Sequence, residues 1–121
     1  MIKLEELPAY TIAVEVSDEV WRSVSLWEWF AKKTIGSQYT ESTDSIAANI
    51  AEGFGRFHKK DKIKFYFNAR ASAFESAHWT KRAKTRELIS DLQFESIMKK
   101  LRQLPKEINY LIKLTNDNLK T

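Results

Sequence analysis

The stretch SIAANIAEGFGR, residues 45–56, decides the fold because it reads as one helix that ends on two glycines. Its apolar residues Ile46, Ile50 and Phe54 recur every four positions, so a helix places them on one face. The alanines between them leave room for a neighbouring backbone to approach closely. Glycine readily adopts the left-handed conformation that closes helices, so we expect the two glycines to end this helix and begin a turn.

A polar stripe runs along the same stretch and allows two interpretations. Ser45, Asn49, Glu52 and Arg56 follow one another at helical spacing. In the structural interpretation, Asn49 and Glu52 satisfy backbone groups at the helix end, and Glu52 pairs with Arg56 four residues later. In the functional interpretation, the stripe lines a subunit contact or a ligand groove. The sequence leaves both open.

The pattern N-x-A-E-G-x-G-R within this stretch resembles the four-helix-bundle family of 23S rRNA intervening-sequence proteins. A related branch is the accessory variability determinant of diversity-generating retroelements. The flanking segments 17–21, 62–65 and 78–79 look similar too, and the resemblance covers about residues 4–115. It implies a homopentameric ring of bundles whose partner is structured RNA or a retroelement ribonucleoprotein. The residues of this family motif are Asn49, Ala51, Glu52, Gly53, Gly55 and Arg56.

Apolar periodicity predicts four helices in one domain, residues 1–121, packed as an all-α, antiparallel up-down-up-down bundle. We expect Asp91 to cap the last helix and Pro105 to kink it. Within the third helix we expect Phe67 and Phe74 to lie on the core face with Ile63. The expected helices span roughly residues 8–27, 33–53, 60–86 and 91–117.

Composition removes several classes of function. The chain has no cysteine, which excludes disulfides and thiolate chemistry and fits a cytoplasmic location. No apolar run approaches the ~20 residues of a membrane span, so we expect no membrane partner. We recognise no nucleophile, phosphate-loop or metalloprotease motif. The only histidines, His58 and His78, lack the partners of a di-iron site. We therefore expect no enzyme activity, metal or cofactor.

Charge is concentrated in one segment. Residues 1–55 hold four lysines and arginines against nine acidic residues, a net of −5, whereas residues 56–86 hold ten against two, a net of +8. Cations at the C-terminal end of the third helix interact favourably with its dipole. Cations at its N-terminal start interact unfavourably with the dipole, so their presence indicates another role, such as phosphate binding. The candidate nucleic-acid-binding residues are Arg56, His58, Lys59, Lys60, Lys62, Lys64, Lys81, Arg82, Lys84 and Arg86.

Three interpretations of these cations remain open. They bind nucleic acid without sequence preference, or they form a solvated surface, or they dock an acidic protein such as a retroelement reverse transcriptase. Apolar residues in excess of one core also predict self-association. Val14 and Trp21 form a second stripe on the first helix, and Phe65 and Tyr66 carry apolar surface around the third. We expect these four residues at contacts between copies.

Overall fold

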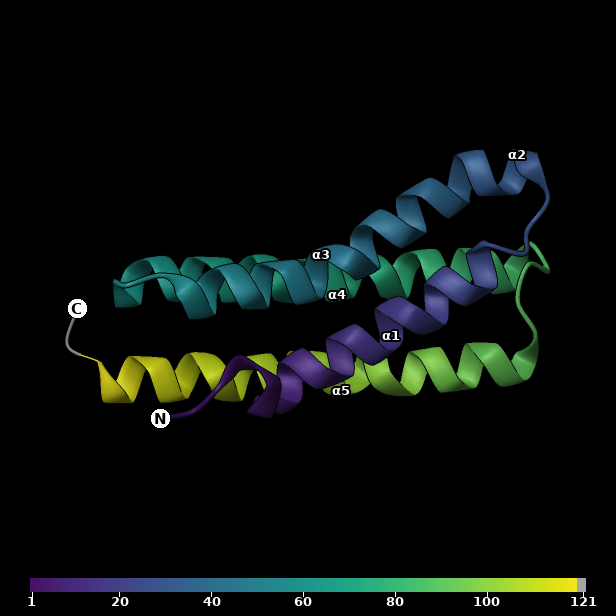
Figure 1. Ribbon diagram of the computed structural model, residues 1–121. Coiled ribbons are helices and arrows are strands. Elements are labelled where there is room, and N and C mark those ends of the chain that lie inside the picture. The colour runs from purple at the N-terminus through teal and green to yellow at the C-terminus, as the bar shows by residue number, and fades with distance from the viewer. Residues whose placement is uncertain (120–121) are drawn as a thin grey trace.

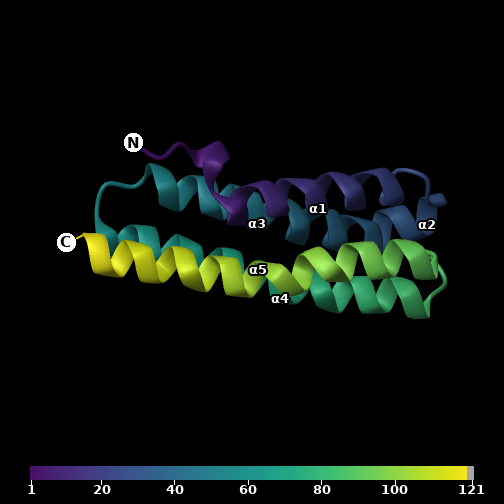
Figure 2. The same cartoon turned by 90° about the horizontal axis from the view of Figure 1, so that it is seen from below.

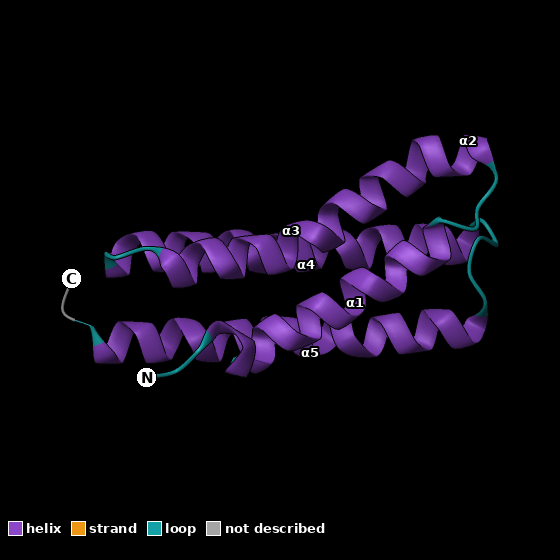
Figure 3. Ribbon diagram, viewed as in Figure 1, coloured by secondary structure: helices purple, strands orange, loops and turns teal. Residues whose placement is uncertain are grey.

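The computed structural model describes residues 1–119 and contains helices and loops, with no strand among these residues (Figure 3). A short 3-10 turn, Leu4–Glu6, precedes the first helix. The prediction of an all-α chain with four long helices is confirmed. The helices are α1 Pro8–Val24, α2 Trp29–Ala31, α3 Ser37–Gly55, α4 Lys59–Thr85 and α5 Asp91–Asn118.

The second long helix begins earlier than predicted. The one-turn α2 continues through a π-helical segment, Lys32–Gly36, directly into α3. Its start is fixed by Glu28, whose carboxylate accepts the backbone N–H groups of Phe30 and Ala31 at 2.9 and 2.7 Å. The expected start at residue 33 was therefore wrong. The residue that starts the helix is an acidic cap, Glu28, which stands inside a cluster of aromatic residues.

The π-helical segment packs tightly against α1. A Cβ added to Gly36 would lie 2.9 Å from Val24 Cγ1 and 3.1 Å from the Ala31 carbonyl oxygen. The Thr40 hydroxyl also donates to the Gly36 carbonyl. Gly36 is thus required by close contact between the first and second helices.

The long helices occupy the corners of a square. Helices α1 and α3 form one layer, and α4 and α5 form the other (Figures 1 and 2). Both α1 and α4 pack against α3 and α5, so α1 and α4 stand at diagonal corners. Helices α3 and α4 run in opposite directions, since Tyr39 contacts Thr80 at one end and Gly53 approaches Tyr66 at the other.

Small residues of α4 face the core. Ala69, Ala73 and Ser76 are buried there, and the Ser76 hydroxyl donates to that of Ser42 at 3.1 Å. The prediction for the core face was wrong, because Phe67 and Phe74 are 48% and 58% exposed. Close packing of α3 on α4 favours alanine and serine at the interface and leaves the phenylalanines outside.

The connection between α4 and α5 is closed by local backbone motifs. Glu87 has a φ of 59°, and the Leu88 N–H donates to the Ala83 carbonyl at 2.9 Å while the Glu87 N–H donates to that of Lys84. These bonds form a Schellman motif with a glutamate at the position that usually holds glycine. Helix α5 then begins with a capping box between Ser90 and Gln93.

The cap of α5 differs from the expected one. Ser90, not Asp91, is its cap, because the serine hydroxyl accepts the Gln93 N–H at 3.1 Å. Pro105 lies inside a helix that continues from residue 91 to 118. Helix α5 buries apolar residues at heptad spacing, and these include Ile97, Leu101, Leu104, Ile108 and Leu111.

Candidate nucleic-acid interface

The α3–α4 corner, residues 53–62, contains the glycines of the family-like motif. A Cβ on Gly53 would lie 2.7 Å from the Tyr66 ring and 3.0 Å from the Lys62 carbonyl oxygen, whereas one on Gly55 would meet nothing within 4 Å. Neither glycine has a positive φ. The expectation that they adopt left-handed conformations was wrong: close approach of α4 is the reason for Gly53.

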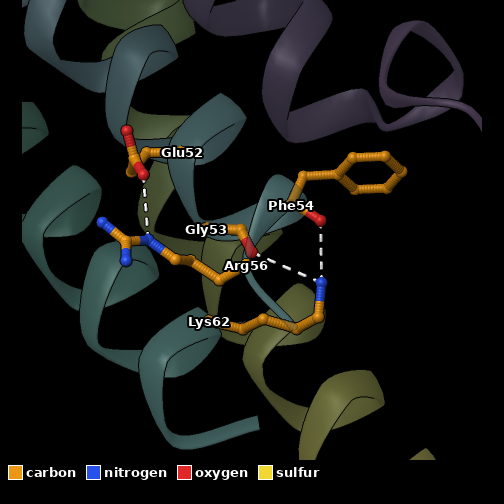
Figure 4. A network of polar contacts seen from close by, with 5 residues as sticks. All are labelled: Glu52, Gly53, Phe54, Arg56 and Lys62. Carbon is orange, nitrogen blue, oxygen red and sulfur yellow. Dashed lines mark hydrogen bonds and ion pairs between the residues drawn. The ribbon is translucent and has the colours of Figure 1, made fainter. Parts of the chain in front are cut away.

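Lys62 points into this corner and closes the end of α3 (Figure 4). Its ammonium donates to the Phe54 carbonyl at 2.7 Å and lies 3.4 Å from that of Gly53. The same nitrogen lies 5.7 Å from the centroid of the Phe54 ring. Burial lowers the pKa of Lys62, which is half-buried. A cation therefore sits at the negative end of the α3 dipole.

Lys59 plays the same part for α5. Its ammonium donates to the carbonyls of Asn116 and Leu119 at 3.3 and 2.9 Å. Two of the lysines at the start of α4 thus cap the C-terminal ends of its neighbours. This arrangement accounts for part of the cationic crowding that opposes the dipole of α4 itself.

The polar stripe of α3 follows the structural interpretation in part. Arg56 Nε lies 2.9 Å from Glu52 Oε2, as expected (Figure 4). The Arg56 guanidinium also lies 4.7 Å from the centroid of the Phe65 ring. Asn49 donates to the Ser45 carbonyl at 2.8 Å, within its own helix. The expected closing of the helix end by Asn49 and Glu52 is replaced by Lys62, which approaches from the next helix.

One cation at the far end of α4 also has a partner. Lys84 Nζ lies 2.7 Å from Asp91 Oδ1, and the hydrogen bond to this carboxylate raises the pKa of Lys84. The ammonium lies 5.9 Å from the centroid of the Phe94 ring. This pair ties α4 to the start of α5 at an exposed position, where it adds little stability.

Six of the ten candidate cations form neither an ion pair nor a side-chain hydrogen bond within residues 1–119, whereas Arg56 and Lys84 form ion pairs and Lys59 and Lys62 bond to carbonyls. Arg82 is half-buried and the others are exposed. They fall into two groups at opposite ends of α4, so one chain does not bring them together. At 1.5 Å per residue, the 21 residues from Lys60 to Lys81 span about 32 Å. The six are His58, Lys60, Lys64, Lys81, Arg82 and Arg86.

The predicted contact residues divide between surface and core. Trp21 is 62% exposed, and Val14 and Phe65 are half-buried. Tyr66 is only 2% exposed, so its assignment to a contact between copies was wrong. It packs against Gly53 and belongs to the core. Burial also raises the pKa of the Tyr66 hydroxyl to about 12.

Sequence reasoning missed the outward face of α4, where Phe67 and Phe74 lie seven residues apart. The spacing of Ala69, Ala73 and Ser76 was the signal for the true core face. Within residues 1–119 no cluster of three potential metal ligands occurs. No helix in this part of the chain has the length and apolarity to cross a membrane.

Comparisons with known proteins address the fold and the family. The family model described as 23S rRNA-intervening sequence protein matches residues 5–110. The fold is similar to that of a protein of unknown function from the S23 ribosomal protein family of Bacteroides thetaiotaomicron, solved by crystallography. The TM-score is 0.77 at 23% identity, and the match covers 87% of this chain and 98% of the other. A comparison with curated proteins gave no match.

Proposed function

Because the chain belongs to the 23S rRNA-intervening sequence protein family, we propose that it is a non-enzymatic protein that binds structured RNA. The cations at the two ends of α4 that have neither an ion-pair partner nor a capping role in residues 1–119 carry this proposal. Lys60, Arg82 and Arg86 represent both ends of the helix. Phosphate contacts of this kind bind nucleic acid with little regard to sequence and weaken as salt rises.

We also propose that the protein self-associates into a ring, for which the family resemblance implies five copies. Exposed Trp21 on α1 supports association. A ring multiplies the two separated cationic groups of each chain and lets one RNA touch several of them, which strengthens binding without any new contact. The absence of cysteine supports the cytoplasm as the place where this occurs.

A charge-matched pair of variants tests RNA binding. One variant carries Lys60→Gln, Arg82→Gln and Arg86→Gln, and the control carries Lys99→Gln, Arg102→Gln and Lys106→Gln on the exposed surface of α5. Lys59 and Lys62 are left intact because they cap helices. Anisotropy of a labelled structured RNA is measured against salt. We expect the first variant to bind about tenfold more weakly at low salt, with a salt slope reduced by about 2.

Equal RNA affinity in the two variants contradicts an RNA site on α4. If the wild-type protein binds no RNA at low salt, the function moves to the second candidate, a scaffold whose basic surface docks an acidic protein such as a reverse transcriptase. The mass of the protein from light scattering, with and without RNA, then separates assembly from RNA binding.

A further inference from the structure

The outward face of α4 carries an apolar seam that we name the α4 ridge. Its members are exposed and alternate at intervals of three and four residues, the spacing of a coiled-coil seam. Two large aromatic side chains, Phe67 and Phe74, form its centre, and a lysine stands at each end. The ridge consists of Lys64, Phe67, Ala71, Phe74, His78 and Lys81.

The ridge lies opposite the buried face of the same helix. Ala69, Ala73 and Ser76 are at most 1% exposed, while Phe67 and Phe74 stand 48% and 58% exposed. Placing alanine inside and phenylalanine outside leaves apolar surface in water unless a second surface covers it. The periodic seam indicates a cover that runs along the helix.

A complementary surface exists on the other side of the molecule, along the outer edges of α1 and α3. The Ser17 hydroxyl donates to Asp44, which joins the two helices at this edge. Small and apolar residues alternate there with carboxylates. We name this surface the acidic face, and it consists of Val14, Asp18, Trp21, Glu41, Asp44 and Ala48.

The acidic face offers room for aromatic side chains. A pocket of about 290 Å³ lies beside Trp21 at one end of this face, lined also by Val24, Thr40 and the cationic Lys32. The exposed methyl of Ala48 farther along α3 permits close approach of another helix. Carboxylates at positions 18, 41 and 44 are opposite in charge to the two lysines that end the α4 ridge.

The two surfaces cannot meet within one chain, because α1 and α4 stand at diagonal corners of the bundle (Figure 2). We propose that the α4 ridge of one copy docks on the acidic face of a second copy. This inference rests on the self-association proposed above and names its surfaces. It assigns Lys64 and Lys81 to the contact between copies, so RNA binding rests on the other free cations, among them Lys60, Arg82 and Arg86. Each copy then uses a different surface toward each neighbour, and such a heterologous contact closes into a ring or continues as a filament.

Light scattering without RNA tests the ridge. Phe74→Asp places a charge at the centre of the contact, so we expect the mass to fall to the 14.2 kDa of one chain. Leu92→Asp is the control, since Leu92 is an 82% exposed apolar residue on α5 and lies outside both surfaces. It keeps the wild-type mass. Circular dichroism confirms that both variants stay helical.

Cross-linking tests the pairing of the two surfaces, and the cysteine-free chain suits it well. One chain carries Ala71→Cys on the α4 ridge, and another carries Ala48→Cys on the acidic face; both sites are exposed. A short bis-maleimide linker is added to each variant alone and to their mixture. We expect covalent dimers in the mixture and few in either variant alone.

Each contrary result has a distinct meaning. A wild-type mass of one chain overturns both self-association and this inference, but leaves RNA binding intact. An oligomer that Phe74→Asp leaves unchanged overturns the ridge alone. Covalent dimers of Ala71→Cys by itself indicate ridge-on-ridge contact and overturn the heterologous pairing. If Phe74→Asp keeps its mass but loses RNA affinity, the ridge contacts nucleic acid, and the inference is wrong.

Discussion

The two ends of α4 are joined to their neighbours in opposite ways. At the α3–α4 corner, closure comes from contacts between helices: Gly53 against Tyr66, and Lys62 on the carbonyls of α3. At the α4–α5 connection, closure comes from backbone bonds within a few residues, with Glu87 in a left-handed conformation. The first corner depends on the fit of two packed helices, whereas the second depends on local chemistry.

This difference predicts where the chain tolerates change. A fitted contact between rigid helices has little freedom to relax, so an added methyl group must move backbone. A local motif loses one hydrogen bond at a time, and water replaces part of what is lost. Substitutions at the α3–α4 corner are therefore expected to cost more free energy of unfolding than those at the α4–α5 connection.

The largest effect is expected for Gly53→Ala. Its methyl group would overlap the Tyr66 ring and meet the Lys62 carbonyl, so we expect a loss of about 3 kcal/mol in the free energy of unfolding. Gly55→Ala is the matched control, because its methyl enters open space and removes a flexible glycine from the last turn. Urea denaturation that finds equal stability for the two alanine variants contradicts the fitted corner.

Lys62→Met is expected to have the next effect. Methionine keeps much of the aliphatic stem but leaves the Phe54 carbonyl without its charged donor, at a cost of about 1–2 kcal/mol. Lys60→Met, at an exposed position two residues earlier, serves as control and changes stability by less than about 0.5 kcal/mol. Thermal denaturation distinguishes them, and similar midpoints for the two variants argue against capping by Lys62.

At the α4–α5 connection, Ser90→Ala removes one half of the capping box. The loss of the hydrogen bond from the Gln93 N–H is expected to cost about 1 kcal/mol. Asp91→Ala tests the assignment, because Asp91 follows the cap and contributes through an exposed ion pair with Lys84. If Asp91→Ala proves more destabilising than Ser90→Ala in urea denaturation, the cap has been assigned to the wrong residue.

Glu87→Gly is expected to stabilise the protein slightly. Glycine adopts a φ of 59° without the steric cost that a side chain carries. The greater flexibility of glycine in the unfolded chain offsets part of this advantage, so we expect the free energy of unfolding to rise by about 0.5–1 kcal/mol. The urea midpoint of this variant is compared with that of Glu87→Ala, which keeps a Cβ and is expected to gain no stability. Destabilisation by glycine would show that the glutamate side chain matters more than its backbone.

The smallest effect at neutral pH is expected for Tyr66→Phe, and it grows with alkalinity. Burial raises the pKa of the Tyr66 hydroxyl to about 12, so the unfolded chain loses this proton first, near pH 10. Stability that is complete below pH 10 is then lost as the pH rises toward 12. Phenylalanine removes this contribution, and the alkaline loss becomes smaller. It does not vanish, because burial also raises the pKa of Tyr39.

The alkaline experiment has its own control. Tyr110→Phe replaces a tyrosine that is 60% exposed on α5, and it should leave the alkaline unfolding curve as in the wild type. A Tyr66→Phe curve that coincides with the wild-type curve from pH 9 to 12 contradicts the raised pKa of the Tyr66 hydroxyl.

The same contrast explains what the sequence could predict. The bounds of α4 and α5 were expected within about one residue, because heptads and helix ends are local signals. The role of Lys62 was missed because it depends on where another helix ends. Phe67 and Phe74 were assigned to the core because they share one helical face with Ile63. The interior instead holds alanine and serine, which only the closeness of α3 explains.

The π-helical segment Lys32–Gly36 has a consequence for the exposed aromatic residues before it. A π turn holds one residue more than an α turn, and each residue turns an α-helix by about 100°. The directions of Trp29 and Phe30, 69% and 65% exposed, are therefore set by that additional residue. A chain one residue shorter here would present both rings to a different side of the molecule.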